Sequence, residues 1–461
     1  MVGASLVAPK AGGFVMRSVL MIAFLFPPRR SVGGKRPLRF ARYLPACGWR
    51  PVILAGPAGT AAENDESLLA SVPHDLRVER DYAPSWLWSL RNLGGRLDER
   101  LRPKSQARNR DDSATSRPTA GGAAELLAGL ADRFVPMDGN LIFRSHAVGA
   151  GARLIEQEKI DALYVTGYPF SAFLVGAELK QRYGLPLICE LRDPWTLNVQ
   201  FADRHPRVAA FERRMEARVF ERSDRVVVTT DTLRDAYARL YPDLPADRFR
   251  RIYSPYDEEQ APPTPRESPP LPAGSPLTVI HFGSFYGPRR AACLLRALAR
   301  LRDRRRLRAS DLLLRIYGRL DAPEDHRAVR DLGLQDSVAI TKPAPYAEGV
   351  AALRAADVLY LPAFGTETFY IPGKMYDYFL AGRPILCETA SPEMEAMMDR
   401  TGAGKCVPVG DEDGMLHFLE KALDARGGGP PVTRPIRAEI ERFSAPAVTR
   451  ELGALLDEVV A

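Results

Sequence analysis

The sequence lacks any apolar run long enough to cross a membrane as a helix. Such a helix needs about 20 consecutive, mostly apolar residues, whereas the apolar segment from Val15 to Phe26 is shorter and ends in Pro-Pro-Arg-Arg. The segment also lacks the small-residue cleavage site of a signal peptide. We therefore expect it to contain the first strand of a folded domain. Residues 1–15 are expected to form a loose leader, with Met16 as an alternative start.

Cysteines and metal-ligand patterns are also scarce. The chain has 5 cysteines in 461 residues, scattered and mostly beside apolar residues, and it has no zinc-like spacing of Cys or His. We expect reduced thiols in the core of a cytoplasmic protein. No Asp-x-Asp pair stands at the end of an expected strand, so we predict a protein that needs no essential metal and no other cofactor.

Neither sign of charge strongly dominates the sequence. Lys and Arg number 64 against 57 acidic residues, which gives a net charge of +7 spread over the whole chain. Binding of nucleic acid usually requires a dense basic patch. The spread charge instead fits an anionic substrate or a mild preference for a membrane surface, and we expect no nucleic-acid partner.

Apolar strand patterns and amphipathic helix patterns alternate in two blocks, which is typical of parallel sheets covered on both faces. In the first block we predict strands at 19–26, 51–55, 162–165, 186–190, 225–229 and 251–253, and helices at 36–46, 144–157, 170–183, 206–222 and after 231. In the second block we predict strands at 277–282, 312–317, 338–341, 357–362 and one ending at 388, and helices ending at 301 and spanning 324–332, 346–355, 374–381, 413–425 and 445–460.

These blocks predict two doubly wound, Rossmann-like α/β domains that face each other across a cleft. A segment crowded with proline, charge and serine separates them and is typical of an interdomain linker. We predict an N-terminal domain at 16–256, the linker at 257–276, a C-terminal domain at 277–445, and a final helix at 446–461 that packs back on the first domain.

Two stretches of the first block stand outside this alternation. Residues 102–122 are polar and of low complexity, which predicts a disordered insertion. Residues 84–102 place Trp and Leu on one side and Arg between them. This segment is either an amphipathic helix packed on the domain or a surface that rests on an anionic membrane or covers an acceptor site.

The second block contains a strand, loop and helix suited to an anion. Lys374 and Asp377 are three residues apart, so both can lie near the first turn of the helix that Gly382 ends. Free N–H groups and the positive dipole end make that turn a place for an anion. A lysine for phosphate beside a carboxylate for sugar hydroxyls suits a nucleoside diphosphate. A surface ion pair is the alternative interpretation.

The first block places two polar loops at the ends of expected strands, where open α/β sheets bind ligands. One contains Gly33 and Gly34, which indicate either close approach to a ligand or a plain tight turn. The other reads Arg192-Asp193-Pro194-Trp195. Asp193 is placed there for chemistry, although it could also cap or turn the chain before Pro194.

The order and spacing of these motifs resemble the retaining glycosyltransferases of the GT-B fold, in particular the family 4-like bacterial enzymes of polysaccharide and envelope glycan synthesis. The resemblance runs from about Val19 to the end of the chain. It rests on the loops already described, on Phe282 to Tyr286, and on Ile371 to Pro384. It implies a nucleotide-sugar site in the second domain and an acceptor side in the first.

The resemblance also implies roles for single residues of the second domain. Gly283 and Ser284, with Arg289 or Arg290, would meet the diphosphate. Lys374 would support the same phosphates, and Asp377 would hold the ribose hydroxyls.

In the first domain, the resemblance implies an acceptor or phosphate loop set made of Gly33, Gly34, Arg36, Arg192 and Trp195. Asp193 would orient the acceptor or assist proton transfer, while Arg289 would neutralise the leaving nucleoside diphosphate. The sequence departs from the family at two places. The arginine and lysine that the family usually carries in the loop after the first strand of the second domain appear here only as Arg289-Arg290. Of two glutamates that the family often carries eight positions apart, the second is Asp377 here and the first is Phe369, with Glu367 the nearest acid.

The resulting expectation is a hexosyltransferase-type glycosyltransferase (EC 2.4). It would move a sugar, with retention, from a nucleoside-diphosphate sugar to a glycan or lipid-linked glycan, in the cytoplasm or at the inner face of the membrane. Two alternatives remain at this point. One is a nucleotide-sugar epimerase of the same fold, and the other is a catalytically silent sugar-nucleotide-binding or scaffold protein.

Overall fold

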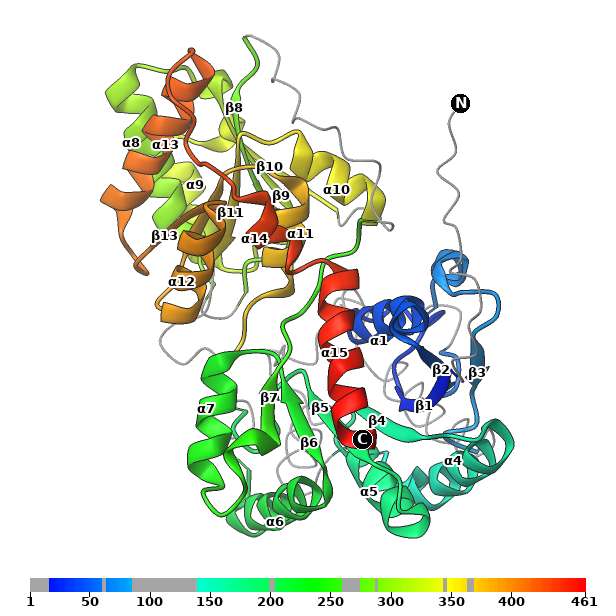
Figure 1. Ribbon diagram of the computed structural model, residues 1–461. Coiled ribbons are helices and arrows are strands. Elements are labelled where there is room, and N and C mark those ends of the chain that lie inside the picture. The colour runs from blue at the N-terminus through cyan, green and yellow to red at the C-terminus, as the bar shows by residue number, and fades with distance from the viewer. Residues whose placement is uncertain are drawn as a thin grey trace, which may run out of the picture.

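The computed structural model describes residues 16–59, 64–84, 138, 140–198, 204–258, 274–286, 289–342, 346–362 and 369–461. Within these ranges the chain forms two α/β domains, one above the other in Figure 1. The predicted leader (1–15), the predicted insertion (102–122) and most of the predicted segment 84–102 and linker 257–276 lie outside the described residues.

The first domain is built on a seven-stranded parallel sheet of order β3-β2-β1-β4-β5-β6-β7. Its strands are β1 Arg17–Ile22, β2 Trp49–Leu54, β3 Arg77–Glu79, β4 Ala162–Gly167, β5 Leu187–Leu191, β6 Arg225–Val228 and β7 Phe249–Arg251. Its helices are α1 Val32–Tyr43, α4 Arg144–Glu158, α5 Ser171–Tyr183, α6 Pro206–Arg222 and α7 Asp231–Leu240. The strand order reverses between β1 and β4, so the carboxyl ends of these two strands mark the switch point where such sheets bind ligands.

The second domain repeats this design with a six-stranded parallel sheet of order β10-β9-β8-β11-β12-β13. Its strands are β8 Leu277–His281, β9 Leu312–Tyr317, β10 Val338–Thr341, β11 Val358–Pro362, β12 Ile385–Glu388 and β13 Gly404–Val407. Its helices are α8 Ala292–Arg305, α9 Pro323–Asp331, α10 Tyr346–Arg354, α11 Gly373–Ala381, α12 Pro392–Thr401, α13 Glu412–Arg426 and α14 Arg437–Glu441. Here the switch point lies between β8 and β11.

The two doubly wound sheets predicted from the sequence are confirmed. The start of α1 was predicted wrongly, because Gly33 and Gly34 lie inside its first turn instead of in a loop. The Ser31 side chain caps this helix by accepting a hydrogen bond from the Gly33 amide at 3.1 Å. Strand β7 ends two residues earlier than we predicted, and α12, β13 and α14 were not predicted.

Arginines on one face of α1 hold the chain where it leaves the first domain. Arg36 donates hydrogen bonds to the carbonyl oxygens of Ile252 at 2.9 Å and Tyr253 at 2.6 Å. Six residues further along the helix, Arg42 forms an ion pair of 3.2 Å with the buried Asp257. The connection to the second domain therefore leaves from a fixed position beside α1.

The C-terminal helix α15, Ala445–Val460, crosses back to the first domain and lies beside α1 (Figure 1). Its buried residues Val448, Leu452 and Leu456 share a hydrophobic core with Val19 and Phe40. Burial of such apolar surface stabilises by about 25 cal/mol per Å². The last helix of the chain is thus part of the core of the first domain.

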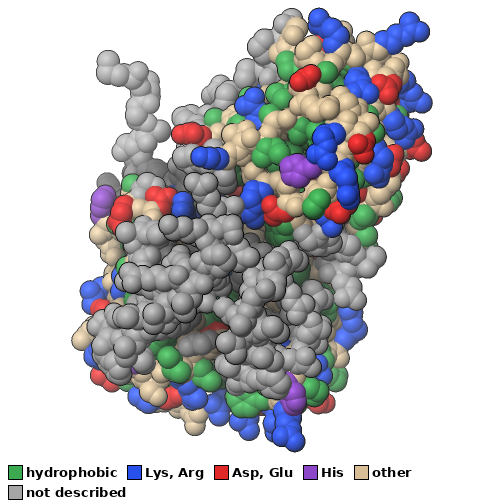
Figure 2. Space-filling model, turned by 180° about the vertical axis from the view of Figure 1, so that it is seen from behind, with side chains coloured by type: hydrophobic (Ala, Val, Ile, Leu, Met, Phe, Trp, Pro, Cys, Tyr) green, Lys and Arg blue, Asp and Glu red, His purple; other side chains and the backbone are tan. Residues whose placement is uncertain are grey.

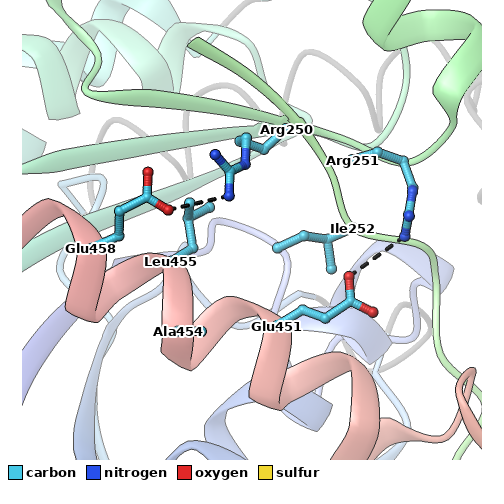
Figure 3. A pocket seen from close by; sticks show the side chains of 7 residues that line it. All are labelled: Arg250, Arg251, Ile252, Glu451, Ala454, Leu455 and Glu458. Carbon is cyan, nitrogen blue, oxygen red and sulfur yellow. Dashed lines mark hydrogen bonds and ion pairs between the residues drawn. The ribbon is translucent and has the colours of Figure 1, made fainter. Parts of the chain in front are cut away.

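Ion pairs connect the other side of α15 to β7. Arg250 lies 3.2 Å from Glu458, and Arg251 lies 3.5 Å from Glu451. These four side chains line a pocket of about 240 Å³ between the strand and the helix (Figure 3). Because its positive and negative charges pair with one another, we interpret this pocket as part of the helix attachment.

Candidate functional site

In the second domain, the loop after β8 meets the start of α11. Gly283 has a φ of +150°, and a Cβ atom at this position would lie 2.4 Å from Cε and 2.9 Å from Nζ of Lys374. Only glycine therefore allows the lysine side chain to lie directly over this loop. The structure brings together two residues, Gly283 and Lys374, that the sequence predicted as parts of one site.

His281, the last residue of β8, lies beneath this loop and was missed by the sequence analysis. It is 2 % exposed, and its Nδ1 lies 3.1 Å from the Tyr360 carbonyl oxygen, so Nδ1 carries the proton and donates it. Burial, and to a lesser degree the positive charges of Lys374 and Arg289, lower the pKa of His281 to about 3. The effect of both cations on one imidazole shows that Lys374 and Arg289 converge here. The only sequence signal was a polar residue at the end of an apolar strand.

The two arginines predicted for the diphosphate differ in their surroundings. The Arg289 guanidinium lies 5.0 Å from the ring centroid of Tyr286 and donates a hydrogen bond of 3.1 Å to its hydroxyl. Burial lowers the pKa of Arg289. Arg290 is half exposed and lies 3.8 Å from Glu324 on the surface. Arg289 is therefore the arginine that faces the site.

Hydrogen bonds fix the loop after β8 in place. The Ser284 hydroxyl accepts from the Arg319 amide at 3.0 Å, which joins this loop to the loop after β9. The Tyr378 hydroxyl of α11 accepts from the Phe282 amide at 3.0 Å and donates to the Tyr360 carbonyl at 3.2 Å. Because the Ser284 hydroxyl accepts in this bond, its own O–H group can still donate to a ligand oxygen.

In the first domain, Arg192 ties together the loops at the switch point. Its guanidinium donates to the carbonyl oxygens of Gly33 and Gly167, which follow β1 and end β4. A Cβ atom at Gly33 would lie 2.6 Å from Nη1 of Arg192, whereas one at Gly34 would be 3.4 Å from the nearest atom. The requirement for glycine at position 33 therefore comes from Arg192 itself, without any ligand.

Asp193 lies next to this junction and faces the second domain. Its side chain is exposed, but protein surrounds it on several sides, and this desolvation raises the pKa of the carboxyl while the charge of Arg192 opposes the rise. Burial and then the charge of Asp193 raise the pKa of Tyr370, which precedes α11 in the second domain. Asp193 and Tyr370 therefore lie close enough to interact electrostatically across the domain boundary.

Two residues predicted for the acceptor or phosphate loop lie in the interior. Arg36 is 5 % exposed and forms a buried ion pair of 2.7 Å with Glu190. Trp195 is fully buried, and its ring stacks on Phe170 with a centroid distance of 5.4 Å. We correct the prediction for Arg36 and Trp195: their side chains support the loops and do not reach the surface that a ligand would meet.

Asp377 lies on α11 one turn after Lys374 and is partly exposed. Its negative charge raises the pKa of Lys35 on α1 of the first domain, although burial lowers that pKa by more. Lys35 was not predicted as a site residue. The helix that carries the predicted nucleotide-binding pair therefore also approaches the first domain.

Polar and apolar contacts join the domains beside this helix. Phe369, which stands where the family often has a glutamate, packs against the core of the first domain, and its carbonyl oxygen accepts from the Thr230 hydroxyl at 3.0 Å. Glu393 of α12 accepts from the amides of Asp231 at 2.7 Å and Thr232 at 2.9 Å, at the start of α7. A carboxylate at a helix N-terminus is a stabilising arrangement, here formed between two domains.

A pocket of about 360 Å³ opens at this boundary, between α7 and α12, with Asp231 and Tyr253 on one side and Glu393 and Arg400 on the other.

Within the described ranges, no group of three or more His, Cys, Asp or Glu side chains is arranged to hold a metal ion. None of the helices in these ranges is long and apolar enough to cross a membrane. On the face seen in Figure 2, Lys and Arg side chains of the upper domain lie among Asp and Glu side chains.

Comparisons with known proteins agree with this geometry. Residues 109–260 match the family model of Glycosyltransferase Family 4. Among curated protein sequences, none matches the chain significantly.

Several solved structures share the fold. Sucrose-phosphate synthase from Thermosynechococcus elongatus is 16% identical, with a TM-score of 0.62 over 96% of this chain and 98% of that one. HepE of Anabaena, solved with UDP and glucose, is 12% identical, with a TM-score of 0.59 over 96% and 99%. The lipopolysaccharide outer core galactosyltransferase WaaB is 11% identical, with a TM-score of 0.55 over 96% and 100%. The chain therefore has the GT-B fold, and its resemblance to family 4 is confirmed over the matched residues.

Proposed function

We propose that this chain is a retaining glycosyltransferase that moves a sugar from a nucleoside-diphosphate sugar to a hydroxyl of a glycan or lipid-linked glycan. The observation that carries the proposal is the convergence of Gly283, Lys374 and Arg289 at the switch point of the second sheet. This is the place where open α/β sheets bind ligands. The family 4 match and a similar structure solved with UDP and glucose support the same conclusion.

The second domain would bind the donor. Lys374 and Arg289, with Arg290 nearby, neutralise charge that develops on the departing diphosphate, and preorganised charges of this kind often supply a large share of catalysis. The backbone of Gly283 and Ser284 lines the same phosphates. The N-cap residue of α11, Pro372, makes no side-chain capping bond, and the start of a helix favours an anion. Asp377 takes the ribose hydroxyls.

The first domain would present the acceptor. Asp193 orients the acceptor hydroxyl or assists its proton transfer, and the rise in its carboxyl pKa makes it a stronger base than an exposed aspartate. Arg192, Gly33 and Gly34 would form the base of the acceptor site in the first domain. Departure of the diphosphate and attack of the acceptor on the same face give retention without a protein nucleophile. No metal or other cofactor enters the proposal, and the site would work in the cytoplasm or at the inner face of the membrane.

The test begins with a thermal-shift panel of nucleotide sugars, because a donor well above its dissociation constant should stabilise the fold by a few kcal/mol. Transfer of the sugar that binds is then measured with labelled donor. Loss of one buried charged contact costs roughly tenfold or more in affinity, so Asp377→Ala combined with Arg289→Ala should reduce donor binding about a hundredfold. Arg327→Ala, an exposed arginine on α9, is the matched control and should bind normally. Undiminished binding by the double variant would refute the site.

A second candidate is a catalytically silent sugar-nucleotide-binding protein. The observation that favours it is Phe369, an apolar interdomain contact at a position where the family often has an acid. Tight donor binding with no hydrolysis and no transfer to any acceptor would support this candidate. Change of the donor sugar without any acceptor would instead identify an epimerase of the same fold.

A further inference from the structure

Helix α6 places a buried carboxylate beneath the loop that carries Asp193. Glu216 is 0 % exposed. Its oxygens accept hydrogen bonds from the Thr196 amide at 3.0 Å and the Thr196 hydroxyl at 2.5 Å. They also accept from the hydroxyls of Tyr237 at 3.0 Å and Tyr241 at 2.6 Å. All four partners are donors, so the acceptor-only, ionised carboxylate fits the site fully.

The network reaches a second amide of the same loop. The Tyr237 hydroxyl, while it donates to Glu216, accepts a hydrogen bond of 2.8 Å from the Trp195 amide. Glu216 thus binds two consecutive backbone N–H groups of this loop. It binds that of Thr196 directly and that of Trp195 through the Tyr237 hydroxyl. These two amides begin only two residues after Asp193. Buried donors that lose such a partner carry a large desolvation cost, so the loop conformation depends on Glu216.

We propose that Glu216 is a positioning residue for the acceptor side: it fixes the loop of Asp193 through Trp195 and Thr196 so that the Asp193 carboxylate faces the second domain. Glu216 reaches no ligand itself, because it is fully buried. The proposal rests on the proposed function of Asp193. A misplacement of about 1 Å at a reacting group can cost a hundredfold in rate.

The same helix supplies a matched control. Glu212 lies one turn before Glu216, is 2 % exposed, and pairs with Arg204 at the start of the helix. Both residues are buried acids on the inner face of α6. Replacing either residue by glutamine removes one negative charge from a buried site. A difference in acceptor kinetics between the two variants therefore reflects the conformation of the Asp193 loop and not a general loss of stability.

The experiment compares Glu216→Gln with Glu212→Gln in the full chain. A glutamine at position 216 places an N–H₂ donor opposite groups that themselves donate, so at least one hydrogen bond of the network is lost. We expect kcat/KM for the acceptor to fall about 10- to 100-fold and the Asp193 limb of the pH–rate profile to shift, while the donor dissociation constant stays within twofold. Tyr241→Phe removes one hydroxyl from Glu216 but leaves the bonds of the Trp195 and Thr196 amides in place, so it should retain most of the activity. Glu212→Gln should lower the melting temperature and leave acceptor kinetics within twofold.

Equal loss of acceptor kcat/KM in the two glutamine variants, at a temperature where both are folded, would overturn the proposal. A donor affinity that falls as far as the acceptor kcat/KM would also overturn it. A readout that needs no turnover separates this proposal from the proposed function. Hydrogen exchange at the amides of Trp195 and Thr196 should accelerate in Glu216→Gln and remain slow in Glu212→Gln, even if no transfer reaction is found. Unchanged exchange in Glu216→Gln would refute the role of Glu216 directly.

Discussion

The neutral histidine beneath the donor loop gives a sharp test of the electrostatics of the second domain. The perturbation is a change of pH from 7.5 to 5, applied to the natural chain and to His281→Asn. An asparagine side chain keeps an N–H donor near the Nδ1 position, where it can still reach the Tyr360 carbonyl. The substitution removes the imidazole, and an asparagine amide does not titrate between pH 5 and 7.5.

The magnitude follows from the shift in pKa. Burial, assisted by Lys374 and Arg289, lowers the pKa of His281 from 6.5 to about 3. Between these values the unfolded chain binds a proton that the folded chain does not, so stability is complete above pH 6.5 and is lost as the pH falls toward 3. Each pH unit is worth about 1.4 kcal/mol. At pH 5 the folded chain should therefore have lost about 2 kcal/mol through His281, and His281→Asn should not show this loss.

The assay is urea unfolding of both proteins at the two pH values, followed through the transition of the second domain, together with an NMR titration of labelled histidine. The difference between the natural chain and the variant isolates His281 from other titrating groups. An imidazole that titrates with a midpoint above 5, or an equal pH dependence in the variant, would refute the reasoning. Donor binding should raise the midpoint, because a diphosphate brings negative charge beside Lys374 and Arg289.

The remaining predictions concern the first domain and the metal. Gly33→Ala should destabilise the fold by about 1–2 kcal/mol, because its Cβ would lie 2.6 Å from Nη1 of Arg192, and overpacking outweighs the gain in helix propensity. Gly34→Ala, whose Cβ would meet its nearest atom at 3.4 Å, should be neutral or stabilising, and chemical unfolding of both variants checks the contrast. Sugar transfer should continue at full rate in excess chelator, measured with labelled donor after dialysis; abolition that added divalent metal reverses would contradict the metal-independent mechanism.

Much of the site could be predicted from the sequence because it depends on local order along the chain. The loops after β1, β5 and β8 follow apolar strands that are buried almost without interruption, and parallel strands bring their carboxyl ends to one edge. Lys374 and Asp377 are close because three residues make nearly one helical turn. Gly283 was predicted from the family resemblance, and the structure gives it a positive φ in the loop after β8.

The contacts made between distant segments could not be predicted in this way. Arg36 and Trp195 look like ligand-binding residues in the sequence, yet the packing of α1 and of the aromatic core turns both inward. His281 and Lys35 look unremarkable, yet each lies near a predicted site residue contributed by another element. Which polar side chain faces a ligand depends on how strands, helices and domains stack, and no local pattern contains that information.

The sequence by itself determined the two α/β domains, the loops at the carboxyl ends of their strands, and the placement of Lys374 and Asp377 one turn apart on a helix, because strand burial and helical period act over a few residues. Only the tertiary structure decided that Phe369 joins the domains and that Glu216 holds the loop of Asp193. These contacts are made between segments remote in sequence, and their energies depend on burial and geometry that exist only after the domains have folded and packed.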